Sequence, residues 1–229
     1  MTAVFAHRGC TEGFVENTLE AFAEARRLGA DGVELDVRLT ADGALAVHHD
    51  AEIPGLGPLH ELGVSDLPAH VPLLAEALGV CEGIVVNVEI KNAPHDPGHD
   101  PAEAVAALTA QAVDEAAWTE RVLVSSFQVS TLRAVRAADS RLALGALWPV
   151  VAPPGDGVAE AVEAGFAAVH PFFTLVDQAL VERSHAAGLA VNAWTVNHPD
   201  ELSRLVGLEV DTVITDALRA ALSIARAET

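Results

Sequence analysis

Residues 32–50 read Gly32-Val-Glu-Leu-Asp-Val-Arg-Leu-Thr-Ala-Asp-Gly-Ala-Leu-Ala-Val-His-His-Asp50, and the organisation of the whole chain can be worked out from them. The first part alternates apolar and polar residues, which is typical of a β-strand with one apolar face. Asp42-Gly43 then predicts a two-residue hairpin turn between two apolar runs. Counting outward from this turn sets Asp36 opposite His49, on one face of the hairpin. We therefore expect the carboxylates of Glu34 and Asp36 to lie close to an imidazole.

The rest of the chain alternates between strand-like and helix-like segments. Apolar strand-like runs occupy residues 3–7, 32–37, 84–90, 122–126, 142–147, 167–170, 190–196 and 212–215. Each of these runs is followed by a segment whose apolar residues are spaced as in an α-helix. Eight strand–helix units in 229 residues predict an α/β fold, a (β/α)8 TIM barrel with the hairpin as an excursion after strand 2. We expect residues 1–229 to form a single domain.

An open doubly wound sheet is the alternative architecture for such an alternation. That fold would require a glycine-rich phosphate loop after the first strand, and His7-Arg-Gly-Cys10 is not one. Capping residues predict several helix ends. Asn17 is a candidate N-cap with Glu20 three residues later, and Asp100-Pro101 is a candidate helix start. Residues 51–71 are rich in Gly and Pro and predict a loop.

The composition argues against several classes of partner. Acidic residues number 33 against 13 basic residues, which gives a formal net charge of −20. A nucleic-acid backbone or an anionic membrane surface would be repelled, so we expect neither nucleic-acid binding nor stable membrane association. The N-terminus has no basic region and no apolar signal core, which favours a cytoplasmic protein. Cys10 and Cys81 have no paired spacing and are expected to be free thiols in a reducing compartment.

Titratable side chains collect where the predicted strands end. In chain order these positions hold His7-Arg8, Glu34, Asp36, Glu89, Lys91, Ser125-Ser126-Phe127, Trp148, His170, Trp194 and Thr215-Asp216. Turn-forming residues such as Gly, Asn and Ser would be expected there by chance. Because the carboxyl ends of barrel strands form the active site, these groups predict a reaction centre.

Glu34, Asp36 and Glu89 form an all-oxygen set on adjacent predicted strands. Hard carboxylate ligands without a thiolate suit Mg²⁺ or Ca²⁺ better than zinc. Without a cation the carboxylates would repel one another, and some would have to bind protons. The alternative is a salt-bridge network in which Glu89 pairs with Arg8 or Lys91.

His7 and His49 would flank this cluster. A lone histidine on a strand is commonly a hydrogen-bonded core residue, but two beside a carboxylate cluster favour a general acid and base. Arg8 and Lys91 would supply positive charge for an anionic group, and Arg suits bidentate contact with phosphate. His48 is expected on the opposite face of the hairpin.

At these positions the sequence resembles the glycerophosphodiester phosphodiesterase family. The matching segments follow the family order over nearly the whole chain: Ala6-His-Arg-Gly9, Glu16-Asn-Thr18, Gly29-Ala-Asp31, Glu34-Leu-Asp-Val37, Thr40-Ala-Asp-Gly43, His49-Asp50, Val88-Glu-Ile-Lys91, Ser126-Phe127 and Trp194-Thr-Val-Asn197. Each segment is weak alone, but together they are specific. Two departures concern the pocket mouth: Val15 replaces the family's usual Pro, and the family's Arg-Thr-Thr segment is missing from a shortened 51–71 region.

The resemblance implies a metal-dependent TIM barrel that hydrolyses glycerophosphodiesters to sn-glycerol 3-phosphate and an alcohol. It implies one divalent cation, Mg²⁺ or Ca²⁺, as the cofactor. The implied metal ligands are Glu34, Asp36 and Glu89. The implied catalytic residues are His7 and His49, and the implied substrate contacts are Arg8, Lys91, Phe127 and Trp194.

Two other functions are weighed against this one. A lysophospholipase D-type activity on the same fold would require an exposed apolar rim near the pocket, and the short region 51–71 gives no sign of one. A non-catalytic metal- or phosphate-binding barrel would have no need of an acid–base pair. The sequence leaves open which histidine is the acid, and whether water or a glycerol hydroxyl attacks first.

Overall fold

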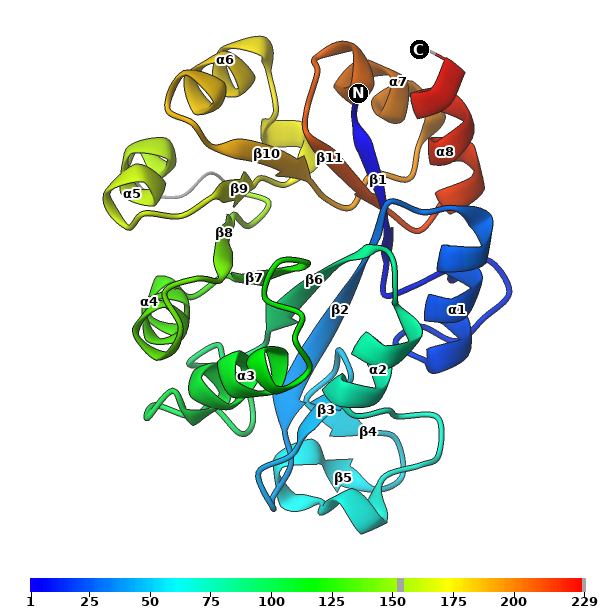
Figure 1. The fold of residues 1–229 in the computed structure, drawn as a ribbon, viewed down its shortest axis with the longest axis vertical. Helices are drawn as coiled ribbons and strands as arrows, with labels where there is room; N and C mark the ends of the chain where they lie inside the picture. The colour runs from blue at the N-terminus through cyan, green and yellow to red at the C-terminus, as the bar shows by residue number, and fades with distance from the viewer. Residues whose placement is uncertain (152–154, 228–229) are drawn as a thin grey trace.

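Eight parallel strands form a closed barrel in the part of the chain that the computed structural model describes, residues 1–151 and 155–227 (Figure 1). The strands are β1 (Ala3–His7), β2 (Gly32–Leu39), β6 (Val85–Ile90), β7 (Val122–Ser126), β8 (Ala143–Leu147), β9 (Ala168–His170), β10 (Ala190–Ala193) and β11 (Thr212–Thr215). Their spatial order is β1-β11-β10-β9-β8-β7-β6-β2, and pairing between β1 and β2 closes the circle. The predicted (β/α)8 barrel is confirmed, and the open sheet is excluded because it would leave two unpaired edges.

A ring of α-helices surrounds the barrel (Figure 1). The helices are α1 (Leu19–Leu28), α2 (Leu74–Val80), α3 (Ala104–Glu115), α4 (Val129–Ala138), α5 (Gly157–Glu163), α6 (Gln178–Ala186), α7 (Pro199–Gly207) and α8 (Leu218–Ala227). Among the described residues, none of the helices combines the length and the apolar character that a membrane span requires.

The alternation in β2 divides its side chains between two environments. Val33, Leu35 and Val37 are fully buried and belong to the main hydrophobic core. Glu34 and Asp36 alternate with them and therefore face the inside of the barrel. The apolar residues hold the strand against the helices, and the strand in turn fixes where the two carboxylates lie.

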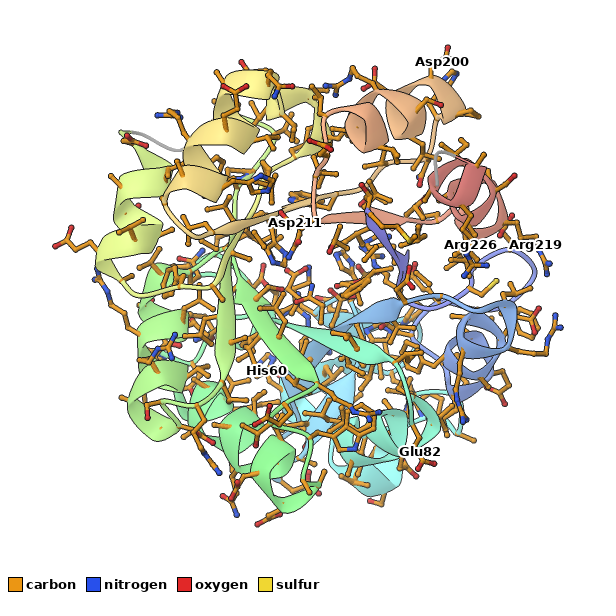
Figure 2. The ribbon with its side chains drawn as sticks, turned by 45° about the horizontal axis from the view of Figure 1, so that its top comes forward. His60, Glu82, Asp200, Asp211, Arg219 and Arg226 are labelled. Atoms are coloured by element: carbon orange, nitrogen blue, oxygen red, sulfur yellow. The ribbon has the colours of Figure 1, made fainter. Side chains whose placement is uncertain are left out.

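Helix α8 contacts the first βα unit of the barrel through two arginine side chains. Arg226 Nη2 donates to the carbonyl oxygen of Gly29 at 2.6 Å, and Arg219 Nη2 pairs with Glu24 Oε1 at 3.2 Å. Figure 2 shows both arginines on the outer side of the ring, beside α1. These contacts bring the last βα unit against the first one.

Two predicted helix starts are wrong. The Oγ1 atom of Thr18, not the side chain of Asn17, accepts the cap bond of α1, from the amide of Ala21. Asn17 instead takes a left-handed backbone conformation (φ 56°), and its side chain bonds to Asp36. Helix α3 begins at Ala104, three residues later than predicted, because Glu103 also has a positive φ (57°) and interrupts the helix.

The hairpin after β2 is shifted by one residue from the predicted register. Strand β3 (Leu45–Val47) pairs Val47 with Val37, and the amide of His48 donates to the carbonyl of Asp36 at 3.0 Å. His48, not His49, is therefore opposite Asp36. The connection contains residues 41–43, with Gly43 left-handed (φ 80°), which is a three-residue hairpin loop. One additional loop residue shifts the register by one.

Region 51–71 has more structure than the predicted loop. It contains a small hairpin of β4 (Glu52–Ile53) and β5 (Gly57–Pro58), followed by 3₁₀ turns at Leu59–Glu61 and Val64–Asp66. A separate small core of Ala46, Ile53, Leu59 and Val71 holds it together.

The inside of the barrel also holds a buried histidine. His170 is fully buried at the end of β9, and its Nε2 lies 2.9 Å from the side-chain nitrogen of Asn192. A Cβ atom at position 145 would lie only 2.3 Å from that same Nε2, so Gly145 is required to make room for the ring. Burial lowers the pKa of His170 to about 3. The folded protein therefore keeps this imidazole neutral.

We expect His170 to make the protein less stable in acid. Between pH 6.5 and about 3 the unfolded chain binds a proton at this residue that the folded chain does not bind, so stability falls as the pH falls. Relative to His170→Gln, the wild type should lose on the order of 3 kcal/mol between pH 7 and pH 4. Urea unfolding at each pH measures the difference, with the exposed His70→Gln as the control. Parallel pH profiles for wild type and His170→Gln would contradict this.

Candidate active site

Three carboxylates meet inside the carboxyl end of the barrel. Glu34 and Asp36 come from β2 and Glu89 comes from β6, where the strand register makes Asp36 and Glu89 direct neighbours. One oxygen from each side chain lies within 4.8 Å of the others, and all three residues are buried. The period-two pattern of β2 and the parallel pairing of β2 with β6 are sufficient to produce this cluster.

Burial and mutual repulsion perturb the acidity of these groups. Burial raises the pKa of Glu34 to about 8, and the negative charge of Asp36 adds to the effect. Burial also raises the pKa of Glu89, although Lys91 opposes it. Burial alone would raise the pKa of Asp36, but the charges of Lys91 and Arg8 outweigh it and lower the pKa to about 2.

Two cations and an amide hold the acidic cluster. Lys91 Nζ lies 3.1 Å from Asp36 Oδ1 and also forms an ion pair with Glu89. Arg8 donates its backbone N–H to Glu34 Oε2 at 3.1 Å, and its Nε lies 3.3 Å from Asp36 Oδ2. Asn17 Nδ2 donates to the same Asp36 oxygen at 2.8 Å. The β1–α1 loop and β6 therefore hold Asp36 from two sides.

The contacts in the β1–α1 loop depend on an uncommon backbone conformation. Arg8 has φ 55° and Asn17 has φ 56°, both in the left-handed region that residues other than glycine rarely adopt. The amide of Asn17 also donates to the carbonyl of Arg8 at 2.9 Å, which holds the two residues together. Strain of this kind is typical of functional sites, where surrounding contacts maintain it.

The cluster fits a hard divalent cation. Glu34 Oε1, Asp36 Oδ1 and Glu89 Oε1 are buried without a hydrogen bond among the described residues, and the latter two contact only Lys91 as ion pairs. Three buried carboxylates in one place supply the oxygen ligands that Mg²⁺ or Ca²⁺ prefers. The salt-bridge alternative accounts for the pairing of Glu89 with Lys91, but it leaves Glu34 Oε1 without a partner.

His7 lies at the edge of the cluster. Its Nδ1 is 2.7 Å from Asp216 Oδ1, and its Nε2 is 3.9 Å from Glu34 Oε2. Burial alone would lower the pKa of His7, but the bond to Asp216 and the charge of Glu34 raise it above the ordinary value. Asp216 follows β11, which pairs with β1. The sequence placed Asp216 at a strand end but gave no indication of a contact with His7.

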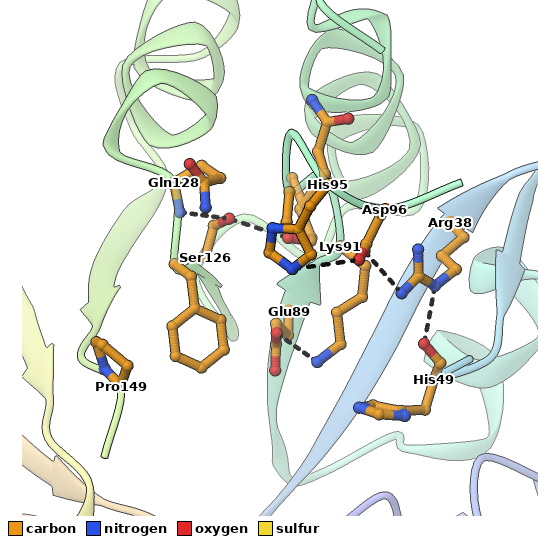
Figure 3. A pocket seen from close by; sticks show the side chains of 13 residues that line it. Arg38, His49, Glu89, Lys91, His95, Asp96, Ser126, Gln128 and Pro149 are labelled. Carbon is orange, nitrogen blue, oxygen red and sulfur yellow. Dashed lines mark hydrogen bonds and ion pairs between the residues drawn. The ribbon is translucent and has the colours of Figure 1, made fainter. Parts of the chain in front are cut away.

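His49 approaches the cluster from the hairpin. Despite the corrected register, it lines the same cavity as Glu89 and Lys91, because it lies beyond the end of β3 (Figure 3). Its Nδ1 is 2.8 Å from Asp50 Oδ1. Arg38 Nε donates to the backbone carbonyl of His49 at 2.8 Å and thereby fixes the chain at this point.

A cavity of about 420 Å³ opens beside the carboxylates. Figure 3 shows it between the ends of β2, β6 and β7, with Lys91 and Glu89 on its inner wall. The other lining residues include Arg38, His95, Asp96, Ser126, Phe127, Gln128 and Pro149. A small organic molecule can therefore contact the acidic cluster and one histidine together.

Two further aromatic side chains pack beside Phe127, which lines the cavity. The rings of Phe127 and Trp194 meet edge to face with centroids 5.5 Å apart, and Phe172 packs on Trp194 at 5.3 Å. Lys91 Nζ lies 5.9 Å from the centre of the Phe127 ring. The sequence patterns did not single out Phe172.

Contacts connect eight of the nine residues that the sequence singled out as site residues: His7, Arg8, Glu34, Asp36, Glu89, Lys91, Phe127 and Trp194. The ninth, His49, lines the same cavity as Glu89, Lys91 and Phe127. The strand-end residue His170 is instead enclosed in the barrel, and Trp148 is buried in the main core.

Known proteins share this architecture. The family model described as the glycerophosphoryl diester phosphodiesterase family matches residues 7–61 and 54–220. A glycerophosphodiester phosphodiesterase of Caldanaerobacter subterraneus is 31% identical over 245 residues, covering 98% of each chain. The structure of an Oleispira antarctica phosphodiesterase in complex with the product sn-glycerol-3-phosphate is 25% identical with a TM-score of 0.88, covering 99% of this chain and 97% of that one. A glycerophosphodiester phosphodiesterase of Thermotoga maritima gives 25% identity and a TM-score of 0.83, with 98% of each chain covered.

We expect cation binding to release a proton. With a pKa of about 8, Glu34 is mostly protonated at pH 7 in the absence of a cation and must lose that proton to coordinate one. Calorimetric titration of Mg²⁺ or Ca²⁺ in buffers of different ionisation enthalpy should therefore show close to one proton released at pH 7 and little release at pH 9. Binding enthalpies that are independent of the buffer at pH 7 would contradict this expectation.

Proposed function

The chain belongs to the glycerophosphoryl diester phosphodiesterase family, and we propose that it hydrolyses glycerophosphodiesters to sn-glycerol 3-phosphate and an alcohol at a cation held by Glu34, Asp36 and Glu89. The observation that carries the proposal is the buried carboxylate cluster with an imidazole on each side. Relatives named glycerophosphodiester phosphodiesterase and the product complex of the Oleispira antarctica protein support the substrate class. The protein is thus an enzyme of the phosphodiester hydrolase type.

The three carboxylates would hold one Mg²⁺ or Ca²⁺. When bound, the cation supplies a Lewis acid that polarises the phosphoryl group and stabilises the charge of the transition state. Asp36 is held ionised by Lys91 and Arg8, and Asn17 fixes its orientation. The protein residues therefore keep one ligand charged and in place before the cation arrives.

Lys91 and Arg8 provide the remaining positive charge of the site. Lys91 reaches the buried carboxylates from the wall of the cavity, and Arg8 reaches Asp36 from the β1–α1 loop. Arg8 also pairs with Glu16 at 2.9 Å, so its guanidinium is held from two directions. A positioned cation of this kind binds the phosphate and stabilises its developing charge.

His7 and His49 perform the two proton transfers. Each imidazole presents Nδ1 to a carboxylate, Asp216 or Asp50, which leaves Nε2 for the reaction. One Nε2 takes the proton of the attacking hydroxyl, and the other donates a proton to the oxygen of the leaving alcohol. Phe127 and Trp194 provide an apolar wall for the carbon skeleton of the glycerol group.

Residues 1–229 would act as one catalytic domain, since the barrel strands come from the whole length of the chain. Cys10 and Cys81 are buried free thiols, which supports a reducing compartment and hence the cytoplasm. The net charge of −20 disfavours nucleic acid and anionic membranes as partners.

A lysophospholipase D-type activity is the second candidate, because the structure has exposed apolar residues near the site. Phe14 and Val15 follow β1, Leu56 lies in the turn of the small hairpin, and Val150 and Val151 follow β8. The loops after β1 and β8 directly follow barrel strands and therefore lie at the carboxyl end of the barrel. Comparing lysophosphatidylcholine with glycerophosphocholine separates the two activities, and we expect faster turnover of glycerophosphocholine.

We expect activity on glycerophosphocholine and glycerophosphoethanolamine that requires Mg²⁺ or Ca²⁺ and is lost with a chelator. His7→Ala and His49→Ala should each lower kcat on the order of 10²–10⁴-fold, because each removes a positioned proton donor or acceptor. Glu89→Gln should weaken cation binding. His70→Ala changes an exposed histidine in region 51–71 and serves as the control. Near-native turnover in both histidine variants would end the acid–base assignment.

The same preparation can determine the order of attack. A ³¹P NMR time course of a single turnover shows whether a cyclic phosphate precedes sn-glycerol 3-phosphate. An early cyclic signal that decays as sn-glycerol 3-phosphate appears would assign the first attack to the neighbouring glycerol hydroxyl.

A further inference from the structure

Asp216 connects His7 to a second side chain that lies further from the carboxylate cluster. Its Oδ1 is 2.7 Å from His7 Nδ1, and its Oδ2 accepts from Asn197 Nδ2, also at 2.7 Å. Asn197 lies in the connection between β10 and α7, and Asp216 follows β11. Three neighbouring strands of the barrel, β10, β11 and β1, together with the loops that follow β10 and β11, therefore supply one row of hydrogen-bonded side chains: Asn197, Asp216 and His7.

The direction of each hydrogen bond in this row is determined by backbone groups. Asn197 Oδ1 accepts the backbone N–H of Asp216 at 2.8 Å and the hydroxyl of Thr215 at 3.3 Å. That end of the amide must be the oxygen, so the end that faces Asp216 Oδ2 must be the NH₂ group. The carboxylate accepts on that side and, when ionised, can only accept on the His7 side as well.

We infer that Asn197 and Asp216 are positioning residues that fix the tautomer and the ring orientation of His7. The proton of the neutral imidazole is held on Nδ1, and the lone pair of Nε2 is directed towards the carboxylate cluster, 3.9 Å from Glu34. The effect of this arrangement on turnover rests on the proposed function. The tautomer itself is a property of the protein that can be measured without any reaction.

His49 provides a contrast within the same site. Its Nδ1 also faces a carboxylate, at 2.8 Å, but the side chain of Asp50 is 72% exposed. Within residues 1–151 and 155–227, that side chain accepts no other hydrogen bond. An amide at position 50 can therefore rotate and present its oxygen to His49, whereas an amide at position 216 is constrained by Asn197.

Asp216→Asn is the decisive variant. Asn197 offers only a donor, so the new amide at position 216 must turn its oxygen towards Asn197 and its NH₂ towards His7 Nδ1. This forces the imidazole proton onto Nε2, and kcat should fall on the order of 10²–10⁴-fold with KM changed by less than about threefold. Long-range ¹H–¹⁵N NMR of the His7 ring, followed to a pH at which the ring is neutral and with and without Mg²⁺, reports the tautomer directly.

A second substitution should reverse the first. In Asp216→Asn/Asn197→Asp, the carboxylate at position 197 accepts from the backbone N–H of residue 216 and from the new NH₂ group. The amide oxygen at position 216 then faces His7 again, so the Nδ1–H tautomer should return with at least about tenfold recovery of kcat. Asp50→Asn is the matched control, and it should leave the tautomer of His49 unchanged.

Three results would overturn the inference. The first is an unchanged His7 tautomer in Asp216→Asn. The second is a switched tautomer without loss of kcat, and the third is a loss of kcat that the double variant does not recover although it folds. Failure of the proposed function would differ from all three, because the wild type would then hydrolyse no glycerophosphodiester while the tautomers remained measurable.

Discussion

Repulsion among three carboxylates buried at one place is the constraint on which the rest of the site depends. Glu34, Asp36 and Glu89 have their oxygens within 4.8 Å of one another, in a part of the barrel that water scarcely reaches. Charges in such a space are costly unless each finds a partner. The protein meets this cost differently at two of the carboxylates. Lys91 and Arg8 keep Asp36 ionised, whereas burial raises the pKa of Glu34 to about 8 and favours its protonated form at pH 7.

The barrel and the acidic cluster could be predicted from the sequence because both depend on local periodicity. Alternation in β2 puts Glu34 and Asp36 on one face, and the parallel neighbour β6 brings Glu89 beside them. The hairpin register could not be predicted in the same way. Asp42-Gly43 suits both a two-residue turn and the end of a three-residue loop. The backbone of Asp42 decides between them, because a two-residue type I′ turn needs a positive φ at both residues and only Gly43 has one.

The missed residues are those whose partners lie far away in the sequence. Asn17 has the residue type and the spacing of an N-cap, but tertiary contact with Asp36 outweighs that local preference, and Thr18 caps α1 instead. Asp216 meets His7 across 209 positions, a contact that exists only because β11 pairs with β1. No pattern within a window of the sequence can report a contact created by closure of the barrel.

Closure also explains why the two imidazoles are supported so differently. His7 ends β1, and its ring contacts Asp216, which follows the neighbouring strand β11. Asn197, from the connection after β10, holds Asp216 in turn. Arg8, with its left-handed backbone, follows His7 directly. His49 follows β3, outside the circle of barrel strands, in an excursion that has its own small core. Among the described residues, its hydrogen bonds come from Arg38 and the exposed Asp50. An imidazole on the rigid barrel and one on a separate hairpin can differ in mobility even though both face the same cluster.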